Sequence, residues 1–128
     1  MPELIASPTA IDSVGNKTKF CDEFVGLVNT GERKVSVTVV HSPMGWEGAA
    51  QWADYDEYRI VIKGTLRVEH AGGTLDVGPA QALHVKPVEE VRFSTPSEGG
   101  AGYINMCLPA FSAATVHRRK ERTLSAVA

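Results

Sequence analysis

Two histidines and one acidic–basic pair are the side chains of this chain whose types suit chemistry near neutral pH. His41 ends the β-branched segment KVSVTVVH, and His84 lies in the short segment ALHV. Glu57 and Arg59 are two residues apart, so on a strand they point to the same face. Histidine and glutamate can accept and return protons, and arginine binds a carboxylate through paired N–H donors. These residues therefore suit proton transfer on a small carbonyl or carboxylate compound.

Sequence motifs of other common chemistries are absent. There is no GxxxxGK[ST] phosphate loop, no GxGxxG dinucleotide turn and no GxSxG nucleophile elbow. Cys21 and Cys107 are lone cysteines, which we expect to be free thiols in a reducing compartment. The N-terminal residues lack the basic and apolar regions of a signal peptide, so we expect a cytoplasmic protein.

The middle of the chain has the pattern of short strands separated by turns. Two-residue alternation and β-branched residues mark the strands, and Gly or Pro marks the turns. Strands at this spacing predict an all-β sandwich or barrel, flanked by an N-terminal strand or arm and a C-terminal tail that is a short helix or an extended arm. The expected ranges are strands 34–41, 58–63, 66–69, 74–77, 82–85, 91–93 and 103–108, a loop at 94–102, the arm at 1–25 and the tail at 113–128.

The composition is that of one ordinary globular domain. The chain has 128 residues, 43% hydrophobic and 22% charged, and we expect a single domain over 1–128. No apolar stretch approaches the ~18 residues of a membrane span, so we expect no membrane partner. The net charge is −2, which favours no nucleic-acid partner, and we interpret the basic run HRRKER (117–122) as a solvated tail.

Residues 45–64 follow the spacing of a known family motif. Gly45 is followed by five residues, Gln51-x-Ala53, three residues, Glu57, six residues and Gly64. This stretch resembles the first motif of the cupin family, in which histidines stand at the positions of Gln51 and Ala53. The glutamate of that motif matches Glu57.

Residues 86–110 resemble the second cupin motif in outline. Val91 stands where that motif has its histidine, and the motif's Pro, Gly and Asn are also missing. The same stretch, with VRFSTPSE and a closing LPAF, is similar to the ethanolamine-utilisation branch of cupins. The resemblance implies a single-domain jelly-roll β-barrel that holds a small-molecule pocket.

The resemblance also bears on metal binding. Cupin metals are held by three histidines and one glutamate, and of these only Glu57 remains in this chain. One carboxylate does not retain Zn²⁺ or Fe²⁺ against water, so we expect no metal and no other cofactor. An alternative is a metal site built from His41, Glu57 and His84.

Alternation divides each strand into two faces, and the inward face has to be assigned. His41 shares a face with Val37 and Val39, which reads as core, so His41 either acts in the pocket or sits at a wet strand end. On the next strand, composition favours Tyr58 and its apolar neighbours inside, whereas the cupin resemblance favours Glu57 and Arg59. We follow the resemblance. The outward apolar row from Tyr58 to Ile62 would then be covered in a homodimer.

Further pocket candidates come from other strands and from the loop at 45–53. His84 points either inward, near Glu57, or outward. Tyr103 and Asn105 share a face of the last strand, and we expect Asn105 outside if Ile104 and Met106 are core. The loop supplies Gln51, at the position of a lost histidine, together with Trp46 and Trp52, which either form an aromatic lid on the ligand or pack the loop down.

Three functions compete at this point. The favoured one is a metal-independent enzyme of isomerase, cyclase or lyase type, with Glu57, His84 and His41 as catalytic residues and Arg59 binding a carboxylate. Gln51, Trp46, Trp52 and Tyr103 complete that substrate site. The second is a binding or sensing module with the same pocket. The third is the metal-binding cupin with the alternative His41–Glu57–His84 site.

Overall fold

The described part of the chain, residues 1–119 of a computed structural model, is built from strands and turns. It contains no helix, and so none that could span a membrane, and the all-β prediction is confirmed. The twelve strands are β1 (Thr9–Ala10), β2 (Phe20–Val25), β3 (Ser36–Ser42), β4 (Trp46–Glu47), β5 (Gln51–Ala53), β6 (Asp56–Gly64), β7 (Leu66–His70), β8 (Gly73–Val77), β9 (Ala82–Val85), β10 (Arg92–Thr95), β11 (Ala101–Leu108) and β12 (Val116–Arg118).

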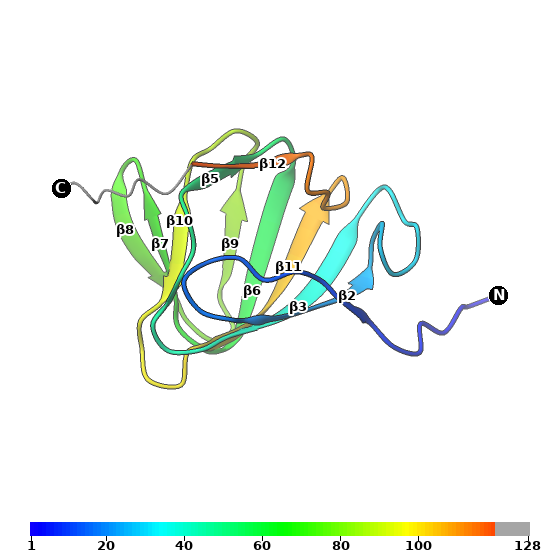
Figure 1. The fold of residues 1–128 in the computed structure, drawn as a ribbon, viewed down its shortest axis with the longest axis horizontal. Coiled ribbons are helices and arrows are strands. Elements are labelled where there is room, and N and C mark those ends of the chain that lie inside the picture. The colour runs from blue at the N-terminus through cyan, green and yellow to red at the C-terminus, as the bar shows by residue number, and fades with distance from the viewer. Residues whose placement is uncertain (120–128) are drawn as a thin grey trace.

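Two antiparallel sheets form the walls of a barrel (Figure 1). The larger has six strands in the order β1-β2-β3-β11-β6-β9, and the smaller has four in the order β4-β10-β7-β8. A two-stranded sheet, β12-β5, lies across one end. The long strands β3, β11 and β6 therefore place the side chains of three distant sequence segments next to one another.

The core lies between the two sheets, and alternation explains it on the smaller one. On β7, Leu66 and Val68 are buried, while Arg67 between them pairs with Asp76 in solvent. From the neighbouring strand Phe93 enters the same interior. Burying one such side chain contributes about 1.5–3 kcal/mol, so these inward rows hold the sheets together.

The inward face of β3 is the opposite of the one that composition favoured. The hydroxyl side chains of Ser36, Thr38 and Ser42 point inward and are buried, while His41 lies exposed on the outer face. Two of the inner hydroxyls have hydrogen-bond partners: Ser36 Oγ accepts the Phe111 N–H at 2.9 Å, and Ser42 bonds the hydroxyl of a tyrosine on β11. A hydroxyl group with a hydrogen-bond partner can be buried at little cost. The hydroxyl residues of β3 can therefore face the interior, and Val37 and Val39 face outward.

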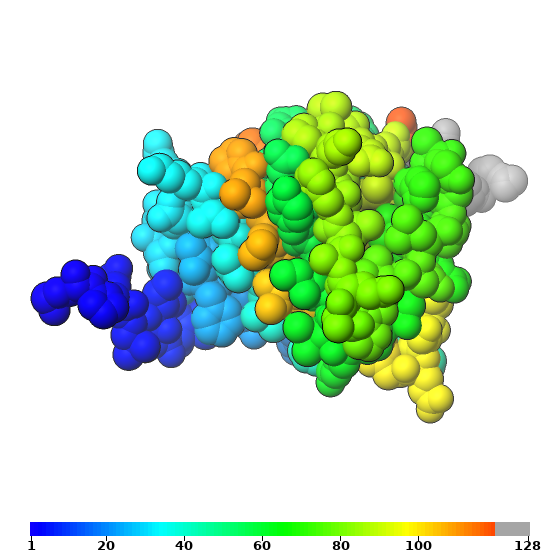
Figure 2. Space-filling view, turned by 180° about the vertical axis from the view of Figure 1, so that it is seen from behind, coloured from blue at the N-terminus to red at the C-terminus, as the bar shows by residue number. Residues whose placement is uncertain are grey.

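The outer face of the six-stranded sheet is apolar. Val39, Ile104 and Ile60 lie opposite one another on β3, β11 and β6, and Ile62 is 60% exposed. Figure 2 shows these strands side by side, with no other segment of residues 1–119 across them. A contiguous apolar sheet face of this kind is typical of a protein–protein contact, so the predicted homodimer stays a prediction with a defined surface.

The chain outside the central strands differs from expectation in detail. The short strands β4 and β5 and the tail strand β12 were not predicted, and β10 and β11 shorten the loop expected at 94–102. The tail is neither helix nor free arm at its start, because Val116–Arg118 pairs with Gln51–Ala53. The rest of the predicted tail, 120–128, lies outside the described residues.

Candidate functional site

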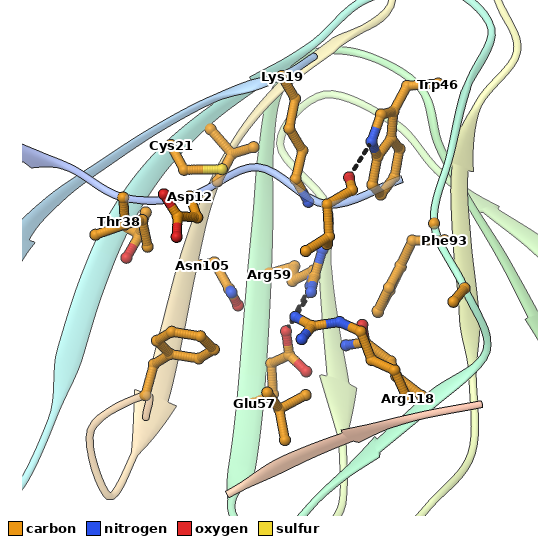
Figure 3. A pocket seen from close by; sticks show the side chains of 18 of the residues that line it. Asp12, Lys19, Cys21, Thr38, Trp46, Glu57, Arg59, Phe93, Asn105 and Arg118 are labelled. Atoms are coloured by element: carbon orange, nitrogen blue, oxygen red, sulfur yellow. Dashed lines mark hydrogen bonds and ion pairs between the residues drawn. The ribbon is translucent and has the colours of Figure 1, made fainter. Parts of the chain in front are cut away.

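A cavity of about 70 Å³ lies inside the barrel, next to the larger sheet (Figure 3). Five charged side chains line it, three cationic and two anionic: Lys19, Arg59, Arg118, Asp12 and Glu57. Its other walls come from β3, β4, β10 and β11. The excess of positive charge makes the cavity suited to an anionic ligand.

The centre of the site is a buried ion pair on β6. Arg59 Nε donates to Glu57 Oε2 at 2.7 Å, and the Nη2 atom contacts the same oxygen. The two residues are 5% and 2% exposed, so Glu57 and Arg59 face the interior as the family resemblance implied. Burial is the largest single influence on the pKa of the Arg59 guanidinium and lowers it, but the charge and hydrogen bond of Glu57, together with Tyr103 and Cys107, raise it overall. Arg59 therefore stays cationic in the cavity.

Aromatic rings hold the guanidinium in place. The Cζ atom of Arg59 lies 3.6 Å from the centroid of the Phe93 ring and 5.6 Å from that of Tyr103. A desolvated cation on an aromatic face gains about 2 kcal/mol. Tyr103, a predicted ligand-binding residue, is buried with its hydroxyl 3.0 Å from Ser42 Oγ, and it supports Arg59 from behind rather than lining the cavity.

Lys19 is a site residue that the sequence analysis missed. Its Nζ atom lies 4.1 Å from the centroid of the Trp46 ring, and burial together with the nearby Arg59 charge lowers the pKa of the ammonium to about 8. Two-residue alternation does not reveal this position. The apolar Phe20 and Phe24 look like the inward-facing residues of their strand, but they lie on its outer side. Arg118, on the unpredicted strand β12, was missed because the basic run 117–122 was interpreted as a solvated tail, whereas Arg118 lines the cavity.

The segment 11–19 crosses the mouth of the barrel and lines one side of the cavity (Figure 1). Asn16 N donates to Glu47 O at 3.0 Å, and Trp46 Nε1 donates to Val14 O at 2.8 Å. Gly15 has a φ of +110°, and a Cβ atom there would lie 2.5 Å from Trp46 Nε1. Only glycine fits this approach, so Gly15 allows the segment to seal onto β4.

The residues at the cupin ligand positions do not fit a metal. Gln51 lines the cavity, Ala53 is buried beside Tyr55, and Val91 belongs to the core. Among residues 1–119, no group of three or more His, Cys, Asp and Glu side chains converges as a metal site. Glu57 is instead bonded to Arg59, so the guanidinium is the cation beside this carboxylate.

Both predicted catalytic histidines lie outside the cavity. His84 Nε2 is 2.8 Å from Asp56 Oδ1, and its ring stacks on Tyr58 at 4.4 Å on the outer side of the sheet. His41 is exposed on β3. Their expected place in the pocket is wrong, because each shares a face with outward residues of its strand. The alternative His41–Glu57–His84 metal site is therefore not formed.

The remaining candidates divide between the cavity and the surface. Trp46 is 2% exposed and lines the cavity, whereas Trp52 stacks on His117 at 5.6 Å, away from it. The two tryptophans therefore form no common lid. Asn105, expected outside, lines the cavity, and its Oδ1 atom is buried without a hydrogen-bond partner in the described chain. An orphaned buried acceptor of this kind points to a ligand or water donor.

Comparison with known proteins shows the fold. No family model matches the chain. Oxalate decarboxylase from Bacillus subtilis superposes with a TM-score of 0.73 at 15% identity, over 96% of this chain and 34% of that one. Streptomyces PAC13 with uridine gives 0.72 at 12% identity, over 94% and 90%. The polyketide cyclase RemF from Streptomyces resistomycificus gives 0.69 at 14%, over 94% and 86%. All three have the cupin fold, so the chain has the predicted cupin fold.

One curated protein is similar in sequence. The endoribonuclease YbeY of Myxococcus xanthus is 29% identical over 99 residues, which cover 77% of this chain and 34% of that protein. The chain thus spans about a third of the length of this relative.

Proposed function

We propose that this chain binds a small carbonyl or carboxylate compound and performs acid–base chemistry on it, of isomerase, cyclase or lyase type, without a bound metal. The observation that carries the proposal is the buried Arg59–Glu57 pair at the wall of the cavity. A guanidinium has five N–H donors, and Glu57 engages it at Nε and Nη2 with a single oxygen. Donors therefore remain for a ligand carboxylate.

The roles of the two residues follow from their chemistry. Arg59 holds the carboxylate or the enolate oxygen, and its fixed charge stabilises negative charge as it develops. Glu57 removes a proton from the carbon next to the carbonyl group and returns it. The segment 11–19 and Trp46 keep bulk water from this exchange.

The similar proteins support a small ligand. Two structures of this fold are named oxalate decarboxylase and polyketide cyclase, and a third contains uridine. The endoribonuclease name belongs to a protein of which this chain covers 34%, and the net charge of −2 does not favour RNA.

A thermal-shift screen with small carboxylates and divalent metals tests the proposal. A ligand of the native state at a hundred times its Kd adds about 2.7 kcal/mol, a shift of several degrees. We expect a carboxylate to raise the Tm of the wild type, and Arg59→Met to lose this shift relative to its own baseline. Arg67→Met is the matched control, because Arg67 pairs with Asp76 in solvent. Stabilisation by a metal alone, with about one metal per chain in elemental analysis, contradicts the proposal.

A second candidate is a binding or sensing protein without turnover. The observation in its favour is the hydrogen bond that already occupies Glu57. Recovery of a bound carboxylate unchanged, with no exchange of its α-proton for deuterium in D₂O, supports this candidate over the enzyme.

A further inference from the structure

Lys19 is an amine in the cavity that the proposed acid–base chemistry does not use. It reaches the cavity from the end of the segment 11–19, and its Nζ atom lies over the Trp46 ring at 4.1 Å (Figure 3). Within residues 1–119, Lys19 forms no ion pair with a carboxylate. Lysines are rarely buried unless they pair with a carboxylate, so the burial of Lys19 must have another cause.

The charges around Lys19 favour its neutral form. Arg59 from β6 and Arg118 from β12 both oppose the ammonium, whereas the Cys21 thiol and Glu57 favour it more weakly than burial and Arg59 oppose it. With a pKa of about 8, roughly a tenth of the amine is neutral at pH 7. An amine that is desolvated beside another cation is the usual setting of a nucleophilic lysine.

Resting on the function proposed above, we propose that Lys19 forms a Schiff base with a small 2-oxo acid whose carboxylate is bound by Arg59. The lone pair of the neutral amine attacks the carbonyl carbon and forms a C–N bond. One proton of the attacking nitrogen passes to the carbonyl oxygen, which gives a carbinolamine. The carbinolamine then loses its hydroxyl group and the second nitrogen proton as water, which leaves the imine. The sum is amine plus aldehyde or ketone to imine plus water, without an oxidant or a reductant.

Two other features of the cavity fit this substrate class. At ~10–15 Å³ for each enclosed water, about 70 Å³ holds roughly five to seven water-sized groups, so the substrate is limited to a few heavy atoms, as in glyoxylate or pyruvate. Asn105 lines the same space, and its Oδ1 atom has no hydrogen-bond partner among residues 1–119, so the side-chain amide is available to bond the carbinolamine hydroxyl. The same Asn105 amide can then accept a hydrogen bond from the water that the dehydration releases.

Reductive trapping tests the proposal on the full chain. Protein is incubated with pyruvate or glyoxylate and sodium cyanoborohydride, and the adduct is located by mass spectrometry of peptides. We expect one adduct per chain at Lys19, formed faster at pH 8 than at pH 6 because the neutral fraction of the amine rises. Lys17→Arg is the matched control and should trap normally, because Lys17 is exposed two residues away. Lys19→Arg should lose the adduct while still unfolding in a single cooperative transition.

The outcomes separate this inference from the proposed function. If pyruvate raises the Tm of the wild type but no adduct forms at Lys19, the Schiff base is wrong and carboxylate binding stands. If pyruvate and glyoxylate neither stabilise the protein nor form an adduct, both proposals fail for this substrate class. Adducts spread equally over Lys19, Lys17 and the other exposed amines also overturn the Schiff base.

Discussion

Removing one partner of the Glu57–Arg59 pair should be the most damaging polar substitution in the barrel. The perturbation is Arg59→Met, which leaves a carboxylate that is 2% exposed without its partner. Loss of one member of a buried pair costs about 3–5 kcal/mol, and the lost stacking on Phe93 acts in the same direction. Glu57→Gln should cost a similar amount, because it leaves the guanidinium without its counter-charge.

A second arginine in the chain serves as a control for the stability lost when the Glu57–Arg59 pair is broken. Arg67 and Asp76 also form an arginine–carboxylate ion pair, with side chains 42% and 45% exposed. Such a pair contributes about 0–1 kcal/mol, so Arg67→Met should be nearly neutral. The two arginine substitutions thus compare one chemical change in a buried and in a solvated setting.

Urea denaturation and thermal melting measure the difference. For a domain of this size, about 3–5 kcal/mol corresponds to a fall in Tm of roughly 10–20 °C. The double variant Glu57→Gln/Arg59→Met should lose less stability than the sum of the single variants, by about 0.5–3 kcal/mol. If Arg59→Met and Glu57→Gln both unfold within about 1 kcal/mol of the wild type, the pair is not a desolvated centre. The assignment of the cavity as the ligand site then falls with it.

Three further predictions concern other parts of the molecule. The folded-state pKa of Lys19 is depressed to about 8, so wild-type stability should rise relative to Lys19→Met as the pH increases from 7 to 9, and a constant difference in urea midpoints would contradict this. Cys21 and Cys107 are buried, and burial raises the pKa of the Cys107 thiol to about 12 and raises that of Cys21. Both thiols should therefore react with a disulfide reagent only after unfolding, and fast labelling at pH 8 in the native state would refute their burial. We expect a homodimer through the outer face of the six-stranded sheet, so light scattering should give twice the chain mass for the wild type and the monomer mass for Ile62→Glu. A wild-type monomer at micromolar concentration would count against that surface.

The fold was predictable because its signals are local. Two-residue alternation and Gly or Pro turns predict strands such as 58–63 and 82–85 close to where they lie. Motif spacing placed Glu57 inside the barrel although composition argued for Tyr58 and Ile60. The resemblance gave the correct face because the motif glutamate of cupins points into the barrel, whereas hydropathy shows only which residues are apolar.

The site was only partly predictable, because it depends on contacts between distant segments. Three of the four inward side chains of β3 are hydroxyl residues and the fourth is Val40, whereas Val37 and Val39 face outward with His41, so the inward face was assigned wrongly and His41 was misplaced. Lys19 and Arg118 reach the cavity from the N-terminal segment and the tail, whose pairing no local pattern indicates. Asn105 was expected on the surface because its neighbours Ile104 and Met106 are apolar and look like core residues. Both neighbours face outward instead, so Asn105 faces the cavity.

Because the cation beside Glu57 is an arginine side chain, the charge of this site does not depend on the supply of metal in the cell. A metal ion in a barrel dissociates, exchanges for other ions and is lost to chelators, so the charge of such a site varies with supply. Arg59 is part of the chain, keeps its proton at any physiological pH and has no second oxidation state. The positive charge of Arg59 is therefore present from the moment the chain folds, one per chain, in metal-starved and metal-replete cells alike.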